Sequence, residues 1–179
     1  MRGSVYRHKK DLKRRIKQLA YRLLTDYEGK NPVFIGVLNG GFMFMADLLR
    51  VLSHPPKRFT PLYPEVDFIR VKSYQGTETT GTVTLVSDID LDVTGRDVVL
   101  IEDIVDTGQT LAFLKTHFER HNVTSLRTVS LLVKNSRATV SHSIEYIGFT
   151  VKNEFIIGYG LDINDKMRSI NHLREIREL

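Results

Sequence analysis

Short runs of consecutive apolar residues, each followed by a small-residue turn and a helical pattern, constrain the fold of this sequence most strongly. Val33–Leu38 is followed by the turn Asn39-Gly40-Gly41 and by a helical pattern over 42–52. Val98–Ile101 is followed by a polar loop and a helical pattern over about 108–121. Strands without polar alternation are typical of a parallel sheet that is covered on both faces, and strands that alternate with helices predict an α/β fold.

Further segments fit the same architecture. Apolar residues at helical spacing predict an amphipathic helix over about 10–27. Five more β-rich segments follow at 66–74, 82–89, 125–134, 146–151 and 154–161. No repeat or linker divides the chain, so we expect one domain over 1–179, built on a largely parallel twisted sheet flanked by helices. The last ten residues, 170–179, fit a strand as well as a helix.

The composition narrows the class of protein. The chain is 41% hydrophobic and 26% charged, as in ordinary globular proteins. It has no cysteine, which removes disulfide and thiol chemistry and suits a reducing compartment. No apolar run reaches the roughly 18 residues that a membrane span needs, and the first residues lack the apolar core of a secretory signal. We therefore expect a cytoplasmic protein with no membrane partner.

The net charge of +5 and the isoelectric point of about 9.5 favour anionic ligands. Much of the positive charge lies in the first predicted helix. Such a basic run is more often a solvated helix face than a surface for nucleic acid. Nucleic acid is therefore not the expected partner.

The stretch 98–110, VVLIEDIVDTGQT, carries the strongest chemical signal. Its last four residues, Thr107 to Thr110, place a glycine and hydroxyl donors at the start of a predicted helix, where backbone N–H groups favour an anion. Carboxylates repel phosphate, so Glu102 and Asp103 are expected to face neutral hydroxyls or a divalent cation. A sugar phosphate bound with Mg²⁺ meets both requirements. Helix capping by the acids explains one carboxylate more readily than three in five residues.

This stretch resembles the phosphoribosyl-diphosphate (PRPP) motif of type I phosphoribosyltransferases. The resemblance runs from GVLNGGFMFMADLL at 36–49 to GYGLDINDKMR at 158–168, and it is strongest to the hypoxanthine-guanine phosphoribosyltransferases. It implies Mg²⁺-dependent transfer of the phosphoribosyl group from PRPP to N9 of hypoxanthine or guanine, with xanthine left open, giving IMP or GMP and pyrophosphate in purine salvage. It also implies a homodimer or homotetramer, and a small hood over the base from the N-terminal helix and about 134–179.

The resemblance assigns roles to individual positions. Asp106 is expected near N7 of the purine as the acid–base group. PRPP is expected at Glu102, Asp103, Asp106, Thr107, Gly108, Gln109 and Thr110. Its pyrophosphate is expected at Leu38, Asn39, Gly40 and Arg168, with a cis peptide bond between Leu38 and Asn39. The purine is expected at Lys134, Phe155, Ile156 and Asp162, the Mg²⁺ ion at Glu102, Asp103 and Asp162, and the start of a lid at Ser73 and Tyr74.

Several of these positions also fit plainer interpretations. Lys134 suits an exposed strand end as well as a donor to the 6-oxo group of the base. Phe155 suits a core position as well as a stacking position. Arg168 suits a surface ion pair with Asp165, and the polar stretch 75–81 suits a simple hairpin loop.

Two positions depart from the pattern of the family that the chain resembles. Asn39 stands where lysine or threonine is familiar, and Gln109 stands where lysine or leucine is frequent. Neither change removes a backbone donor. Both changes leave the affinity for PRPP open.

The alternative function is a regulator with the same fold that binds nucleotides or RNA. The basic first helix is compatible with it. Against it, Asp106, Lys134, Phe155 and Asp162 together match a catalytic set. We therefore expect an enzyme, a hypoxanthine/guanine phosphoribosyltransferase.

His117 and His121 lie one helical turn apart and raise the question of a second metal site. Their stretch, HFERH, does not have the H-E-x-x-H order of metalloproteases. Histidines near the end of a helix also suit its dipole. From the sequence we favour this second interpretation.

Overall fold

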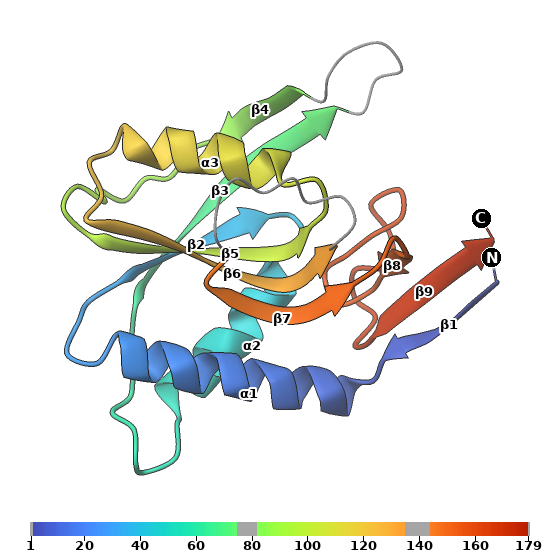
Figure 1. The fold of residues 1–179 in the computed structure, drawn as a ribbon, viewed down its shortest axis with the longest axis horizontal. Helices are drawn as coiled ribbons and strands as arrows, with labels where there is room; N and C mark the ends of the chain where they lie inside the picture. Colours follow the sequence, from blue (N-terminus) through green and yellow to red (C-terminus); the bar gives the residue numbers. More distant parts are fainter. Residues whose placement is uncertain (1, 75–81, 135–143, 179) are drawn as a thin grey trace.

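The computed structural model describes residues 2–74, 82–134 and 144–178. Its main sheet contains β2 (Val33–Leu38), β3 (Glu65–Tyr74), β4 (Thr82–Ser87), β5 (Asp97–Val105), β6 (Ser125–Lys134) and β7 (Tyr146–Val151). The strand order is β4-β3-β2-β5-β6-β7 (Figure 1). Strand β4 is antiparallel to β3, and the other neighbouring pairs are parallel. The predicted α/β fold with a largely parallel sheet is therefore confirmed.

Helices cover both faces of this sheet. Helices α1 (Lys9–Asp26) and α2 (Phe42–Ser53) lie on one face, and α3 (Gln109–Glu119) lies on the other (Figure 1). The buried side chains of α1 recur every three or four residues, as the amphipathic pattern predicted. In the described part of the chain, no helix is long and apolar enough to cross a membrane.

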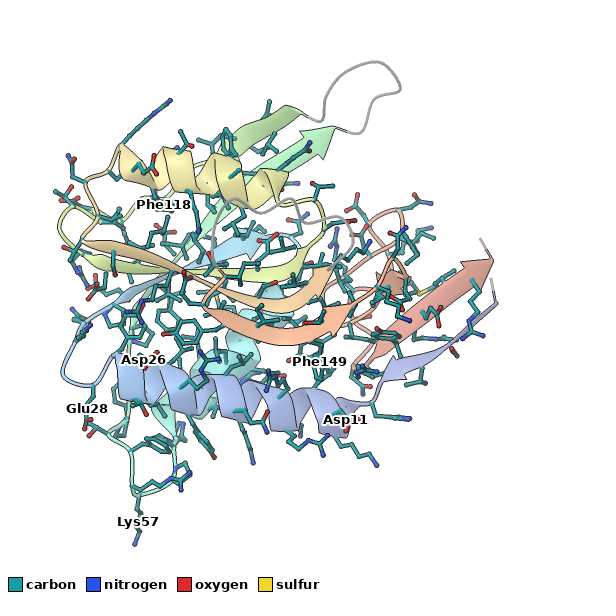
Figure 2. All side chains as sticks on the ribbon, viewed as in Figure 1. Asp11, Asp26, Glu28, Lys57, Phe118 and Phe149 are labelled. Carbon is teal, nitrogen blue, oxygen red and sulfur yellow. The ribbon has the colours of Figure 1, made fainter. Side chains whose placement is uncertain are left out.

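The apolar run of β5 reflects its position between two layers of helices. Val99 and Ile101 belong to a core cluster shared with α1 and α2, whereas Val98 and Leu100 belong to a second cluster shared with α3. Successive side chains of a strand point to opposite faces, so both faces need apolar residues. Figure 2 shows Phe118 on the sheet side of α3, where it is fully buried in the second cluster.

A second, smaller sheet lies beyond one end of the main sheet (Figure 1). It contains β1 (Arg2–Arg7), β8 (Phe155–Ile157) and β9 (Leu173–Glu178), in the order β1-β9-β8 with antiparallel pairing. Among the described residues, strand β1 pairs with the C-terminal strand β9, and helix α1 shares a core cluster with Tyr159, Leu161 and Leu173. Within the ambiguous segment 170–179, residues 173–178 form strand β9, because β1 and β8 pair with it.

The predicted strand over 154–161 is shorter in the structure and lies outside the main sheet. Strand β8 ends at Ile157, because the next three residues, Gly158, Tyr159 and Gly160, all have positive φ angles. This backbone conformation is incompatible with a strand and turns the chain. The turn carries the chain back toward the carboxyl end of the central strand β2, where it approaches Gly40.

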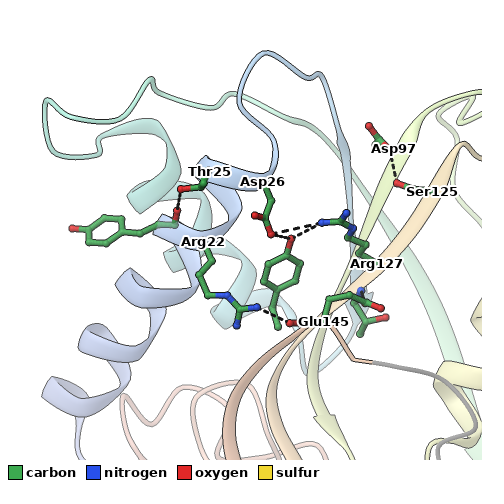
Figure 3. Close-up of polar contacts among 10 residues, drawn as sticks. Arg22, Thr25, Asp26, Asp97, Ser125, Arg127 and Glu145 are labelled. Atoms are coloured by element: carbon green, nitrogen blue, oxygen red, sulfur yellow. Dashed lines mark hydrogen bonds and ion pairs between the residues drawn. The ribbon is translucent and has the colours of Figure 1, made fainter.

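A polar network joins the end of α1 to strands β6 and β7 (Figure 3). The buried Tyr146 donates its hydroxyl hydrogen to Asp26 Oδ2 at 2.6 Å, and Arg127 Nη1 donates to the Tyr146 oxygen at 3.1 Å. Arg127 also lies 3.6 Å from Asp26 as an ion pair. The network gives the buried phenol two partners and holds α1 against the sheet.

Candidate active site

The strand order of the main sheet defines where a ligand is expected. From β2 the chain continues through α2 to β3 on one side, whereas from β5 it continues through α3 to β6 on the other side. The direction of winding therefore reverses between the adjacent strands β2 and β5. In open α/β sheets, ligands bind beyond the carboxyl ends of the strands at such a point. Both turns singled out in the sequence, 39–41 and 106–110, follow these two strands.

Strand β5 is longer than the sequence predicted. It continues past Ile101 to Val105, so Glu102 and Asp103 lie in the strand and not in a loop after it. The reason is the long parallel ladder with β6, which keeps this polar stretch extended. Because side chains alternate along a strand, Asp103 points to the same face as Ile101, toward α2, and Glu102 points to the opposite face.

The turn after β2 packs directly against Asp103. The peptide bond between Leu38 and Asn39 is cis, as the resemblance implied. A Cβ atom at Gly40 would lie 1.5 Å from Asp103 Oδ2 and 2.4 Å from its Cγ. A Cβ atom at Gly41 would lie 2.7 Å from the carbonyl oxygen of Val37. Only residues without a side chain fit here, so the glycines let the turn and the carboxylate share one small volume.

Glu102 and Asp103 form an electrostatically strained pair. Burial raises the pKa of Glu102 well above its usual range, and the neighbouring Asp103 raises it further. Burial also raises the pKa of Asp103 to about 6, although the N–H of Ile104, 2.8 Å from Asp103 Oδ1, acts in the opposite direction. Glu102 Oε2 is buried and accepts no hydrogen bond from the described residues. A cation beside these carboxylates would relieve both effects.

The loop after β5 leads into the N-terminus of α3. Gly108 has a φ angle of +85°, which glycine adopts without strain, and α3 begins at the next residue. Thr107 is exposed, and its Oγ1 atom lies 3.4 Å from the backbone nitrogen of Gln109. Helix N-termini carry backbone N–H groups without partners inside the helix, together with a partial positive charge. The loop therefore has the features of an anion site, and phosphate binding there stays a prediction.

Lys134 and Asp106 form an ion pair at the ends of β6 and β5. Lys134 Nζ lies 2.8 Å from Asp106 Oδ2. The register of the two strands places them there, because Val105 and Val133 are paired neighbours. Lys134 is only 7% exposed. It is therefore not the exposed strand-end lysine that the sequence also allowed.

The turn after β8 brings a third segment to the same place. A Cβ atom at Gly160, which has a φ angle of +101°, would lie 2.1 Å from the carbonyl oxygen of Gly40. Arg168 Nη1 donates to the carbonyl oxygen of Gly160 at 2.9 Å, and Arg168 Nη2 lies 2.9 Å from Asp162 and 2.8 Å from Asp165. Arg168 therefore makes the ion pair with Asp165 that the plainer interpretation suggested, and it also braces the turn that touches Gly40.

Asp162 reaches the site by another route than the sequence suggested. The predicted strand over 154–161 would place Asp162 directly after a strand of the main sheet, but Asp162 belongs to the loop between β8 and β9 of the small sheet. Its charge still acts on Asp103, whose pKa it raises, so the two carboxylates are neighbours. The sequence prediction also missed Gly160. The available signal was the pair of glycines in the stretch GYG directly after an apolar run.

The expected purine and lid positions lie on β8 and at the end of β3. Phe155, on β8, is 45% exposed and is therefore not a core residue. Ile156 beside it is buried. Ser73 and Tyr74 are the last residues of β3. The remaining lid positions, 75–81, lie outside the described residues.

Comparisons with known proteins identify the family of this chain. Residues 3–164 match the family model of the phosphoribosyl transferase domain. The hypoxanthine-guanine phosphoribosyltransferase of Streptococcus agalactiae serotype V is 36% identical over 169 residues, which cover 94% of this chain and 89% of that protein. The crystal structure of a hypoxanthine-guanine phosphoribosyltransferase from Bacillus anthracis superposes with a TM-score of 0.87 at 39% identity, covering 97% of this chain and 98% of that chain.

Another relative is much longer than this chain. The bifunctional protein TilS/HprT of Listeria monocytogenes is 39% identical over 164 residues, or 91% of this chain. Those residues amount to 24% of the bifunctional protein, so the present chain spans about a quarter of its length.

The sheet, the acidic strand end and the loop before α3 define a phosphoribosyltransferase, and the family model matches nearly the whole chain. The chain belongs to the phosphoribosyltransferase family and, with its relatives of matching length, to the hypoxanthine-guanine phosphoribosyltransferases within it.

Proposed function

We propose that this protein catalyses a purine-salvage reaction, the transfer of the phosphoribosyl group from PRPP to N9 of hypoxanthine or guanine. The products are IMP or GMP and pyrophosphate. The observation that carries the proposal is the ion pair of Lys134 and Asp106, 2.8 Å apart, directly before the loop that leads into α3. This pair places a donor and an acceptor for a 6-oxopurine next to an anion-binding helix N-terminus.

Lys134 and Asp106 divide the recognition of the base between them. The lysine ammonium donates to the 6-oxo group and finds no acceptor in the 6-amino group of adenine. As N9 attacks the ribose, the purine becomes more acidic at N7. A carboxylate at Asp106 accepts or holds that proton. The exposed ring of Phe155 supplies a flat surface on which the purine stacks.

The remaining residues position PRPP. The 5′-phosphate binds at the backbone from Asp106 to Thr110 and at the hydroxyls of Thr107 and Thr110. The ribose hydroxyls lie against Glu102 and Asp103, and the pyrophosphate lies between the turn 38–40 and Arg168. Cations and amides thus face the leaving group, while carboxylates face the ribose, on which positive charge develops.

Magnesium is part of the proposal. Glu102, Asp103 and Asp162 supply the hard oxygen ligands that Mg²⁺ prefers, and the buried, unbonded Oε2 atom of Glu102 fits a cation partner. A Mg²⁺ ion held by these residues would supply positive charge that stabilises the departing pyrophosphate. We propose that the protein residues provide the ligands and orient the ribose beside them.

The small sheet is proposed as the hood over the base, and the segment that begins at Ser73 and Tyr74 as the lid. Both would keep water away from the reacting C1′ atom. We further propose one domain over 1–179, because the small sheet packs its turn directly onto Gly40 of the main sheet.

The proposal extends to assembly and location. Exposed apolar side chains on β3 and β4 favour a homodimer or homotetramer: Val66, Phe68, Leu85 and Val86. A cytoplasmic location follows from the substrate, since a polyanion such as PRPP does not cross an apolar barrier unaided.

A nucleotide-formation assay tests the function directly. The purified protein is incubated with Mg-PRPP and separately with hypoxanthine, guanine, xanthine or adenine, and products are separated by HPLC. We expect nucleotide from hypoxanthine or guanine and none from adenine, and the xanthine reaction decides whether the third base is used. A folded protein that binds PRPP but forms no nucleotide with any base would contradict the proposal. That result would favour the alternative of a regulator that binds nucleotides or RNA, which the comparisons do not favour.

Replacing Lys134 by Gln should relax the choice of base. Glutamine can donate to a 6-oxo group and can also accept from a 6-amino group, so the variant loses the discrimination that a pure donor provides. We expect the ratio of kcat/KM for hypoxanthine over adenine to fall by about tenfold or more, on the scale of one charged hydrogen bond. The affinity for PRPP, measured by calorimetry, should not change.

Lys152→Gln is the matched control for this prediction. Lys152 follows β7, the neighbouring strand, and is exposed. It should keep the selectivity of the unmodified protein. If Lys134→Gln keeps that selectivity as well, Lys134 does not read the 6-oxo group.

Replacing Arg168 by Ala should weaken PRPP binding. The substitution removes a guanidinium suited to pyrophosphate and releases the carbonyl oxygen of Gly160, which Arg168 braces at 2.9 Å. We expect the Kd for PRPP, measured by calorimetry, to rise about 10- to 100-fold. Asp165→Asn is the control, because Asp165 is 85% exposed and pairs with Arg168 from the solvent side. Equal PRPP affinities for both variants would mean that Arg168 does not bind pyrophosphate and makes only a surface ion pair.

A further inference from the structure

Three potential metal ligands meet near the C-terminal end of α3, away from the proposed active site. His117 lies in the last turn of α3, and His121 follows two residues after the helix ends. Asp88 comes from a distant segment and directly follows β4. One ligand atom from each of these three residues lies within 4.8 Å of the other two. The sequence showed only the two histidines, and the fold adds the carboxylate.

The two imidazole rings are held in place by aromatic neighbours. The His117 side chain is 14% exposed, and its Nε2 atom lies 2.9 Å from Asp88 Oδ1. Its ring stacks on Phe113 and meets the edge of Phe118, with ring centroids 6.4 and 5.4 Å apart. The His121 ring lies 4.9 Å from the His117 ring and 5.9 Å from the ring of Phe118. Because the rings are already ordered, binding a ligand costs them little conformational freedom.

We propose that Asp88, His117 and His121 form a binding site for a divalent transition-metal ion of the Zn²⁺ type. Two imidazoles and one carboxylate are a donor set that Zn²⁺ prefers and that Mg²⁺, which takes oxygen ligands, does not. With metal–ligand bonds of about 2.0–2.1 Å, tetrahedral ligands stand about 3.3 Å apart. The observed atoms need only small side-chain rotations to reach this spacing, and a water molecule completes the tetrahedron.

The third residue is what separates this cluster from an ordinary hydrogen-bonded pair. Asp88 and His117 would satisfy each other without His121. The second imidazole adds no hydrogen bond that the pair requires, and two protonated imidazoles at this separation would repel each other. A metal ion instead uses both rings in their neutral form together with the carboxylate. Asp92, whose carboxylate is close enough for His121 to help lower its pKa, adds negative potential near the same point.

The position of the cluster indicates a structural role. Helix α3 has 11 residues and is therefore about 16 Å long, and the loop proposed to bind phosphate lies at its other end. The metal would tie the connection between β4 and β5 to α3. The metal would hold the C-terminal end of α3 in place without contacting the substrates, so nucleotide formation should not depend on metal binding.

A zinc titration of the full chain tests this site. The chain carries no histidine tag, and excess Mg²⁺ is present to occupy the carboxylates of the active site. The affinity for Zn²⁺ is measured by competition with a chromophoric chelator, and Co²⁺ is used as a spectroscopic probe of a tetrahedral site. We expect His121→Gln to weaken Zn²⁺ binding at least about 100-fold and Asp88→Asn to weaken it at least about 10-fold. Both variants should lose the visible Co²⁺ bands. His54→Gln is the matched control, since His54 is an exposed histidine at the end of α2, and it should bind as the unmodified chain does.

His121→Gln and Asp88→Asn keep the experiment interpretable, because neither residue is buried and circular dichroism verifies that each variant is folded. If both variants bind Zn²⁺ and Co²⁺ as the unmodified chain does, the proposal is overturned and Asp88 and His117 form only a hydrogen-bonded pair. The same conclusion follows if the unmodified chain takes up no Zn²⁺ in excess Mg²⁺.

Discussion

Asp106→Asn is expected to lower kcat for hypoxanthine by about 10²-fold or more, because the amide cannot accept the proton that the purine loses as N9 attacks. The KM for PRPP should change much less, since the backbone of the loop 107–110 is unaltered. Steady-state kinetics with hypoxanthine as the varied base measure both quantities. Near-normal turnover would remove Asp106 from the acid–base chemistry.

Because Asp106 forms an ion pair with Lys134, this variant has a second effect, which must be separated from the loss of proton transfer. Asparagine leaves the charge of the nearly buried Lys134 without its carboxylate partner, and an unpaired buried charge by itself disturbs a site. The double variant Asp106→Asn/Lys134→Gln removes both charges. If proton transfer is the cause, the double variant stays as slow as Asp106→Asn. Recovery of kcat in the double variant would instead assign the loss to the unpaired lysine.

Gly40→Ala is expected to raise the Kd for PRPP by at least about 100-fold. The new methyl group would lie 1.5 Å from Asp103 Oδ2, so either the turn 38–40 or the carboxylate must move. Interiors are close-packed, and a displacement of about 1 Å in a binding site can cost 10²-fold in activity. Calorimetric titration with Mg-PRPP measures the loss. Unchanged PRPP affinity would mean that neither the turn nor the carboxylate of Asp103 contacts PRPP.

Gly29→Ala separates this effect from a general loss of stability. Gly29 has a φ angle of +70°, so alanine is strained there, but a Cβ atom at this position meets nothing within 4 Å. This control should lower the thermal midpoint and keep the affinity for PRPP. Gly40→Ala should lose PRPP binding even at temperatures where circular dichroism shows it fully folded.

The main sheet could be predicted from the sequence because its physical requirement is local. A strand covered on both faces needs consecutive apolar residues, and the segment Val33–Leu38 has the bounds that were predicted. The end of β5 could not be predicted in this way. Glu102 to Val105 are two acidic residues followed by two apolar ones, which is neither an apolar run nor an alternating pattern, and only the ladder with β6 keeps them extended.

The small sheet escaped prediction for a related reason. Strand β1 is short and charged, and its partner β9 lies at the opposite end of the chain. Neither strand carries enough apolar residues to be recognised alone. Asp162 was assigned to the correct neighbourhood from the motif but to the wrong element, because the positive φ angles of 158–160 redirect the chain after β8.

The candidate site also divides into features that the sequence could predict and features that it could not. The kinds of side chain could be read from the stretch 98–110, since three carboxylates beside an anion loop restrict the chemistry strongly. Distances could not be read. The contact of Gly40 with Asp103 and the approach of Gly160 to Gly40 join residues far apart in sequence. Outside this site, the meeting of Asp88 with His117 does the same.

The pairing of β1 with β9 bears on the order in which the molecule is completed during its synthesis. Arg2 lies opposite Glu178 in this pair, so the small sheet needs the first and the last residues of the described chain at once. The main sheet ends at Val151 and can form while the ribosome still holds the remaining residues. Gly160 and Arg168, whose turn rests on Gly40, belong to the part that emerges later. A nascent chain would thus hold a finished main sheet and an open site until strand β9 has left the ribosome.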